Sequence, residues 1–246
     1  MHVPASGHHL VIGAWVSRDK VAPVFELELT RAWDETTTFR RLHLKNDPVF
    51  SSQHTSPGQY VKISTGGEVA YFALASAPGL ELELLVRRGA PAADALALFE
   101  QGARISLSAP MGRGYPLAEH TGRDLILCAA GSAIAPIRAV ISSVMQQRAA
   151  FGQVSLFYGT RTENDFAYLA EQVAWRAAGI DVVCVVSKPG KTWLGPAGYV
   201  QDALALRAPR LDQAVAYLCG MKGMTEAVTA ELTARGLAKK LIFLNF

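Results

Sequence analysis

The stretch LILCAAGSAIAPIRAVI, residues 125–141, has the form of a buried strand, a tight turn and a helix. Its first residues are almost all apolar, as in parallel strands that are covered on both faces. Gly131 opens a run of small residues, and Pro136 stands in the first helical turn, where its missing N–H costs little. Small side chains at such a turn let a pyrophosphate approach the N–H groups of the helix N-terminus. Tight packing explains the pattern about as well, so this turn alone does not identify a nucleotide site.

Further apolar runs of this kind follow, and each ends at a small or hydroxylated residue. The runs are 154–160, 181–187 and 214–220, and helical patterns are expected at about 135–150, 165–178, 198–207 and 223–235. A last strand, KLIFLNF, closes the chain. This alternation predicts a doubly wound parallel sheet with a ligand crevice at the carboxyl ends of its strands.

The half of the chain before this sheet has a different sequence pattern. It consists of short strand-like runs from Val11 to about Leu117. These runs are 24–30, 39–44, 59–64, 69–75, 80–87 and 104–108, with one expected helix at 91–102. Closely spaced short strands separated by Pro and Gly are typical of an antiparallel barrel or sandwich. We therefore expect a barrel domain over residues 8–119 and an α/β domain over residues 120–246.

Composition excludes several classes of protein. The 246 residues carry a net charge of +3 with no basic stripe, which argues against nucleic-acid binding. Cys128, Cys184 and Cys219 are too few and too widely spaced for a disulfide framework, a zinc site or a four-cysteine iron–sulfur cluster. No signal peptide is evident, and no apolar run approaches the ~18 residues of a membrane span. A cytoplasmic protein without membrane insertion is expected.

Side chains that could bind or position a ligand follow the strands of the expected parallel sheet. They are Arg161 after the second strand, Ser187, Lys188, Lys191 and Tyr199 after the third, and Cys219 with Gly220 at the fourth. Each has a plain alternative: a solvated cation in a loop, or a cysteine that packs as a small hydrophobe. A single strand end would not indicate a ligand site, but four adjacent strand ends together indicate a crevice.

Seven motifs in consistent order make the chain resemble the ferredoxin–NADP reductase superfamily, in which a flavin-binding barrel precedes a nicotinamide-nucleotide domain. The motifs are PGQYVKIS (57–64), FALASAPG (72–79), SAPMGRGYPL (108–117), GSAIAPI (131–137), FYGTR (157–161), GYVQDAL (198–204) and YLCGMKGMTEAV (217–228). The last, similar to the family's C-G-P-x-x-M, is the most specific. The resemblance covers nearly the whole chain.

Several positions depart from the family's motifs. Ala70 stands where an arginine normally holds the flavin phosphate, and Phe72 replaces the tyrosine that stacks on the flavin ring. Ala73 replaces the hydroxyl residue that faces flavin N5, and Ala93 the hydroxyl of the phosphate-binding segment. Ala133 replaces a glycine of the nucleotide turn, and Met221 a proline. A charge-assisted hydrogen bond is worth roughly 1.5–3 kcal/mol, so flavin binding is expected to be about tenfold to a hundredfold weaker.

The resemblance implies roles for individual residues. Residues 70–76, which include Phe72, Ala73, Leu74, Ala75 and Ser76, would line the isoalloxazine. Residues 89–96, which include Gly89, Ala92 and Ala93, would receive the flavin pyrophosphate, with Arg87 or Arg88 supplying charge. Gly131, Ser132 and Ala133 would approach the nicotinamide cofactor's pyrophosphate, and Arg161, Ser187, Lys188 and Tyr199 would surround its adenosine. Cys219, beside Gly220 and Met221, would position the nicotinamide, and Phe246 would either cover the flavin or only pack the closing strand. The reacting centre would thus involve Ala73, Cys219 and Phe246.

The implied activity is flavin-dependent NAD(P)H oxidoreduction. Hydride would pass from NADPH or NADH to FAD, with FMN possible, and electrons would continue to an unidentified small-molecule or protein acceptor. Two alternatives remain: a flavin-free nucleotide-binding or regulatory module that kept the fold, and the reductase subunit of a larger electron-transfer complex.

Overall fold

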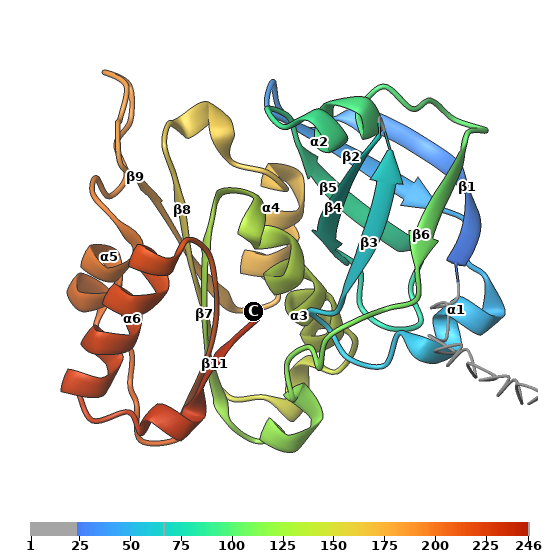
Figure 1. The fold of residues 1–246 in the computed structure, drawn as a ribbon. Coiled ribbons are helices and arrows are strands. Elements are labelled where there is room, and N and C mark those ends of the chain that lie inside the picture. Colours follow the sequence, from blue (N-terminus) through green and yellow to red (C-terminus); the bar gives the residue numbers. More distant parts are fainter. Residues whose placement is uncertain (1–23, 66, 246) are drawn as a thin grey trace, which may run out of the picture.

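A computed structural model gives the fold, and it describes residues 24–65 and 67–245. Two sheets dominate the molecule: a six-stranded antiparallel sheet of order β4-β3-β6-β1-β2-β5 and a five-stranded parallel sheet of order β11-β10-β7-β8-β9 (Figure 1). The predicted fold class, an antiparallel barrel followed by a doubly wound parallel sheet, is confirmed.

The antiparallel sheet curls into a nearly closed barrel. An isolated bridge between Leu74 and Leu84 brings its two edge strands, β4 and β5, into contact. The strands are β1 (Val24–Asp34), β2 (Phe39–Leu44), β3 (Tyr60–Thr65), β4 (Glu68–Ala73), β5 (Leu82–Arg87) and β6 (Arg104–Ser108). Closure leaves little exposed backbone edge, as expected for a small barrel.

Two short helices belong to the barrel. The sequence patterns did not predict α1 (Pro48–Gln53), which Asp47 caps by accepting the N–H groups of Val49 and Phe50. The helix expected over 91–102 is α2 (Pro91–Leu96), and it ends after six residues. Beyond it, Leu98 and Phe99 donate to carbonyls three residues back, a tightening that ends the helix well before Gly102.

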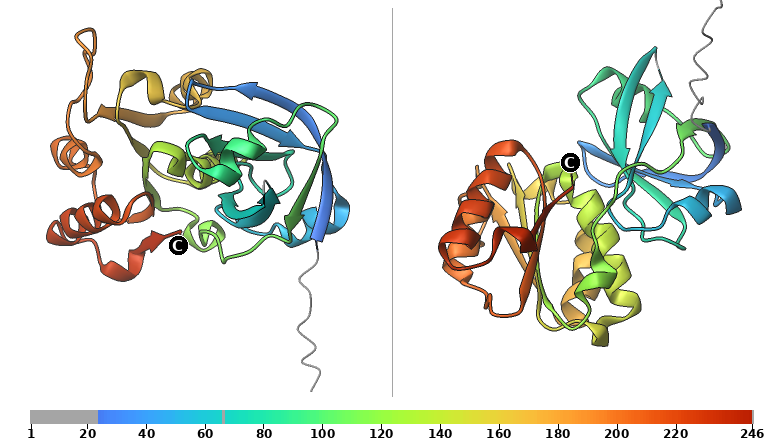
Figure 2. Two further views of the ribbon diagram at one scale, coloured as in Figure 1. Left: turned by 45° about the horizontal axis from the view of Figure 1, so that its top comes forward. Right: turned by 60° about the horizontal axis from the view of Figure 1, so that its bottom comes forward.

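The parallel sheet carries helices on both faces. Its strands are β7 (Asp124–Ala130), β8 (Val154–Thr160), β9 (Ile180–Val186), β10 (Ala214–Cys219) and β11 (Ile242–Leu244). Its helices are α3 (Ile134–Gln146), α4 (Leu169–Ala177), α5 (Val200–Arg207) and α6 (Lys222–Ala234), and short 3₁₀ turns include η2 (Gly131–Ala133) and η3 (Arg148–Ala150). In Figure 1 and Figure 2, α3 and α4 lie on the side of the sheet that faces the barrel, whereas α5 and α6 cover the other side.

One apolar core spans both sheets. Phe39 and Leu85 of the barrel belong to the same buried cluster as Ile134 and Ile137 of α3. The barrel therefore packs directly on the helix that follows the first parallel strand, which places β4 and β5 near the carboxyl ends of the parallel strands. Among the described residues, no helix is long and apolar enough to cross a membrane.

Candidate functional site

A cavity of about 1020 Å³ opens between the barrel and the parallel sheet. Its barrel side is built by β4, the end of β5 and the start of α2. Its other side is built by the ends of β7, β8 and β10 and by the segments that follow β8 and β9. Small-molecule pockets usually measure ~300–1,000 Å³, so the cavity has room for a large ligand or for parts of two ligands.

The register of the parallel strands brings the predicted strand ends together. Cys219 pairs with Ala129, and Ala130 pairs with Gly159, so three strands end at one level. Most of the predicted site residues line the cavity: Phe72, Ala73, Arg87, Ala93, Gly131, Ser132, Ala133, Arg161, Ser187, Lys188, Tyr199, Cys219, Gly220 and Met221.

Other predicted residues lie elsewhere. Leu74 and Ala75 have no exposed surface, and Ser76 and Ala92 are buried beside them. Arg88 and Gly89 lie outside the lining, as does Lys191. Phe246 lies outside the described residues, so its predicted role stays a prediction.

The turn after β7 offers backbone donors to the cavity. Gly131 adopts φ +57, a left-handed conformation that side chains disfavour. Its carbonyl oxygen accepts a hydrogen bond from the hydroxyl of Tyr158 at 3.2 Å, which helps to fix the conformation of the turn. Within the part of the chain that the structure describes, no side chain caps η2 or the start of α3. The N-terminal N–H groups at Ser132 and Ala133 can therefore serve an anionic ligand group.

Two cations stand at the neighbouring strand ends. Arg161 follows β8 and Lys188 follows β9, and neither has an ion-pair partner among the described residues. The nearby carboxylates are already engaged, because Asp165 accepts from Thr162 and Glu163 accepts the N–H of Gly190. This part of the cavity therefore has uncompensated positive charge.

Cys219 lies at the junction of the two halves. Its thiol is 6% exposed, and burial raises its pKa to about 12, an effect that Asn245 partly offsets. The side chain is accordingly a neutral thiol at neutral pH and cannot act as a thiolate nucleophile. The predicted positioning role of Cys219 is compatible with a neutral thiol and stays a prediction.

The barrel side presents the edge of β4. Leu74 donates its N–H to Gln59, and Ala73 stands opposite Tyr60 in the β3–β4 register. In an antiparallel pair, alternate residues turn their backbone groups outward, so the N–H of Ala73 points away from β3, and Ala73 lines the cavity. Phe72 is only 8% exposed because most of its ring packs in the barrel core. The surface thus offers an aromatic edge and a backbone donor in place of the missing hydroxyls.

The two arginines predicted to supply charge to the flavin phosphate have different surroundings in the structure. Arg88 forms an ion pair with Asp34 at 2.6 Å, whereas the exposed Arg87 lines the cavity and has no such partner among the described residues. The start of α2 is a poorer anion site than the sequence suggested, because Pro91 lacks an N–H and Asp94 already accepts the N–H of Gly89.

A flavin therefore fits this surface with reduced anchoring. The ring end would meet Phe72, Ala73 and an apolar wall, and the phosphate end would have Arg87 as its cation. The sequence patterns missed much of that wall. Ala70, Tyr71 and Ala90 line the cavity and lie inside the predicted ranges 70–76 and 89–96. The lining residues that were not predicted are Thr38, Phe39, Leu85, Ala130, Ala135, Pro136, Gly159, Thr160, Asp165, Gly198, Val200 and Met224. Most of these are apolar or small and carry no chemical signal of their own; several are direct neighbours of predicted residues.

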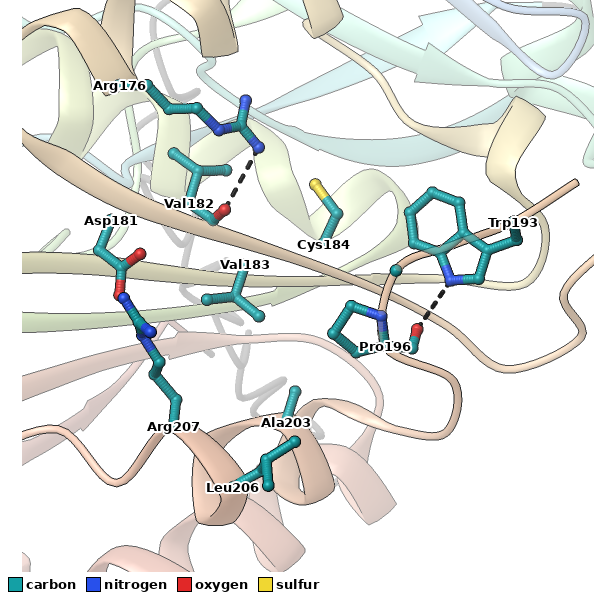
Figure 3. Close-up of a pocket in the computed structure, with 11 residues that line it drawn as sticks. Arg176, Asp181, Val182, Val183, Cys184, Trp193, Pro196, Ala203, Leu206 and Arg207 are labelled. Atoms are coloured by element: carbon teal, nitrogen blue, oxygen red, sulfur yellow. Dashed lines mark hydrogen bonds and ion pairs between the residues drawn. The ribbon is translucent and has the colours of Figure 1, made fainter.

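A second hollow of about 530 Å³ lies at the edge of β9 (Figure 3). Val183 and Cys184 form its floor, and Trp193, whose indole N–H donates to the carbonyl of Pro196 at 2.9 Å, forms one side. Arg176 donates to the carbonyl of Val182 at 3.2 Å and so occupies part of the strand edge. None of the predicted site residues lines this hollow, so the interdomain cavity is the candidate site.

Comparison with known proteins agrees with this geometry. The model of the family described as "Oxidoreductase NAD-binding domain" matches residues 127–230. The fruit protein pKIWI502 of Actinidia deliciosa is 27% identical over 226 residues, covering 82% of this chain and 69% of the relative. The ferredoxin–NAD(P)(+) reductase component of the naphthalene 1,2-dioxygenase/salicylate 5-hydroxylase systems of Ralstonia sp. is 28% identical over 219 residues, covering 84% and 64%. The chain thus spans about two thirds of each relative's length.

A solved structure shares the fold. The ferredoxin NADP+ reductase from Neisseria gonorrhoeae, with bound FAD and NADP, superposes with a TM-score of 0.75 over 91% of this chain and 99% of that chain, at 16% identity. The fold is that of oxidoreductases that bind a flavin and a nicotinamide nucleotide, and these comparisons support the resemblance to the ferredoxin–NADP reductase superfamily seen in the sequence.

Proposed function

We propose that this protein is an NAD(P)H oxidoreductase that holds FAD against β4 and the nicotinamide nucleotide against the ends of β7 to β10. The observation that carries the proposal is the single cavity shared by both surfaces, in which Ala73 and Cys219 belong to one lining. When bound, the flavin supplies the capacity to take a hydride from reduced nicotinamide and to release electrons to an acceptor. The domain boundary is proposed near residue 120, between β6 and β7.

The chain's own residues would orient the two ligands and exclude water between them. Ser132 and Ala133 would bind the nicotinamide pyrophosphate through backbone N–H groups, and Arg161 with Lys188 would bind the adenosine end. Cys219 would hold the nicotinamide by contact, and the outward N–H of Ala73 would donate to the flavin ring. Tyr71, Tyr199 and Met221 are 61%, 63% and 76% exposed although they line the cavity, which is expected of side chains that a ligand covers.

Arg87 would supply the charge for the flavin phosphate. Arg88, the neighbouring cation, is held by Asp34 and does not line the cavity. With Ala70 and Ala93 contributing no polar side chain, we expect flavin affinity below that of relatives with the full motif. FAD is preferred over FMN on the family resemblance.

The absorption spectrum of the protein as purified, before and after NADPH or NADH is added, tests the proposal. Flavin bands that bleach with either nucleotide support it. A colourless protein that neither binds added FAD nor oxidises either nucleotide would contradict it.

The second candidate function is a flavin-free nucleotide-binding or regulatory module. Ala70, Ala93 and the carboxylate of Asp94 at the start of α2 favour this candidate, because together they remove positive charge and donors from the phosphate end. Nucleotide binding without any FAD binding, measured by calorimetry on one sample, would identify it.

The electron acceptor is proposed only as a chemical class. The Ralstonia relative is named as a ferredoxin–NAD(P)(+) reductase component of oxygenase systems. A small one-electron acceptor protein is therefore the first class to test, and a larger electron-transfer complex is the alternative. Reduction of a ferredoxin or of cytochrome c by the flavin-loaded protein with NADPH would support the first class, and copurification with a partner subunit the second.

A further inference from the structure

A buried carboxylate joins the two halves of the molecule. Glu83 of β5 is 1% exposed, yet its carboxylate contacts Arg41 at 2.9 Å and Arg138 at 3.0 Å. The hydroxyl of Tyr168 donates to it at 3.0 Å, and the imidazole of His43 lies 3.1 Å from it. Burial alone would favour the neutral acid, but these partners keep the pKa of Glu83 below its ordinary value. The group is therefore an anion at neutral pH.

The partners of Glu83 come from both halves. Arg41 belongs to β2, Arg138 to α3, and Tyr168 immediately precedes α4. Glu171 of α4 binds Arg138 in a bidentate manner at 2.7 and 3.0 Å and also contacts Arg41 at 2.8 Å. The guanidinium groups of both arginines lie over the ring of Tyr168, at 4.6 and 4.8 Å from its centroid. We call Arg41, Glu83, Arg138, Tyr168 and Glu171 the interdomain clasp.

The clasp also holds the segment that follows the flavin-facing edge of β4. Arg138 donates to the carbonyl of Ala75 at 2.8 Å. Ala75 donates its N–H to the carbonyl of Glu83 at 2.9 Å, and Glu83 donates its own N–H to the hydroxyl of Ser76 at 3.1 Å. Residues 75 and 76 come only two and three residues after Ala73, which lines the cavity. Their burial is thus a consequence of being anchored to the clasp.

Arg138 connects the two sides of the cavity through one rigid helix. Ser132 and Ala133, at the nucleotide turn, run directly into α3, and Arg138 lies in the second turn of that helix. The turn and α3, which would offer backbone donors to the nicotinamide nucleotide, therefore also bind, through Arg138, the backbone that follows the flavin-facing strand. Figure 1 shows α3 between the parallel sheet and the barrel, where it can perform both tasks.

We infer that Arg138 is a positioning residue that sets the separation between the nicotinamide and flavin surfaces of the cavity, with Glu83 and Glu171 as its partners. This inference rests on the proposed function. Productive transfer requires reacting atoms about 3–3.5 Å apart, and a misplacement of about 1 Å can lower a rate about 10²-fold. Loss of Arg138 should therefore slow transfer between the ligands far more than it weakens the binding of either one.

The test compares Arg138→Met and Arg138→Lys with the wild type and with the control Arg148→Met. Lysine keeps the charge but cannot form the bidentate pair with Glu171. Arg148 is a matched control because its guanidinium also donates to backbone carbonyls, those of Phe151, Gly152 and Ala178, all within the parallel-sheet half. The measurements are the anaerobic rate of flavin reduction by NADPH, the affinities for FAD and NADPH, and amide hydrogen exchange of residues 73–76.

Arg138→Met should reduce flavin about tenfold to a hundredfold more slowly, with each affinity changed less than threefold. Its amide exchange at residues 73–76 should increase, and Arg138→Lys should recover only part of both effects. Arg148→Met should change neither. A wild-type reduction rate in Arg138→Met, or unchanged exchange at 73–76, would overturn the inference.

Two further outcomes remain decisive. If the wild type binds no FAD, the proposed function fails, and exchange at residues 73–76 in the protein without flavin still decides whether Arg138 fixes that segment. If Arg138→Met does not fold, Arg138→Lys and Glu171→Gln take its place, with the same rate and exchange expected to support or overturn the inference.

Discussion

The backbone N–H of Lys188 donates to the carbonyl oxygen of Arg161 at 2.8 Å, which joins the two segments that leave β8 and β9. Both residues line the cavity, and the carboxylates of Asp165 and Glu163 are engaged with other groups. Both side chains are exposed, so a phosphate held between them would gain charge-assisted hydrogen bonds that salt weakens.

This pairing predicts a preference for NADPH over NADH. Lys188→Ala and Arg161→Ala should each lower kcat/KM for NADPH about tenfold or more, because each removes a charge-assisted contact of roughly 1.5–3 kcal/mol. The value for NADH should change little. Lys191→Ala is the control, since Lys191 does not line the cavity. Equal specificity constants for both nucleotides, unaltered in Lys188→Ala, would show that the cations are only solvated.

Arg87 is predicted to be the flavin-binding cation. Arg87→Ala should weaken FAD binding about tenfold or more, because a charge-assisted hydrogen bond is worth roughly 1.5–3 kcal/mol. Arg88→Ala should leave affinity nearly unchanged, because Arg88 is held by Asp34. Quenching of flavin fluorescence on titration measures both. An equal effect of the two variants would contradict the assignment, and an absence of saturable quenching at millimolar protein would contradict flavin binding itself.

Ala73 is predicted to limit the rate of flavin reduction. Ala73→Ser adds a hydroxyl beside the outward backbone N–H, and a second donor at the reacting centre should accelerate anaerobic reduction without a comparable change in nicotinamide affinity. Stopped-flow absorbance measures the rate. An unchanged or slower rate would mean that the backbone N–H already performs the task of the missing hydroxyl.

The buried His54 predicts a loss of stability in mild acid. Its Nε2 is buried and has no hydrogen-bond partner among the described residues, and burial lowers its pKa from 6.5 to about 4. The unfolded chain takes up the proton first, so the free energy of unfolding should fall as pH drops from about 6.5 towards 4. Urea unfolding at several pH values should show this decline, and the decline should be shallower in His54→Phe. Parallel pH profiles in the two proteins would contradict it.

The sequence predicted the parallel half best. Each of its continuous apolar strands ends within one residue of the expected position, because burial on both faces leaves an unbroken apolar run bounded by turn residues. The helix α1 escaped prediction, since PVFSSQ has no amphipathic period and depends on the cap supplied by Asp47. The length of α2 was overestimated, because its alanines favour a helix locally, whereas Leu98 and Phe99 donate to carbonyls three residues back and so end it.

Candidate site residues could be predicted where they lie within a recognisable sequence motif at the end of a strand. Cys219 and Gly131 were located by their positions at strand ends. The interdomain clasp was not foreseen, because its members are distant in sequence: the hydroxyl bond from Tyr168 to Glu83 spans 85 positions. Nothing local in the sequence distinguishes a glutamate on a strand surface from one that a second domain will cover.

The apolar cluster shared by Phe39, Leu85 and the α3 residues Ile134 and Ile137 has a consequence for how the chain folds. Each half supplies part of the other's interior, so cutting the chain near residue 120 would leave large apolar side chains facing water on both fragments. Unfolding should accordingly follow one calorimetric transition rather than two. Fragments produced separately should be insoluble, and regain native structure only when they are refolded together.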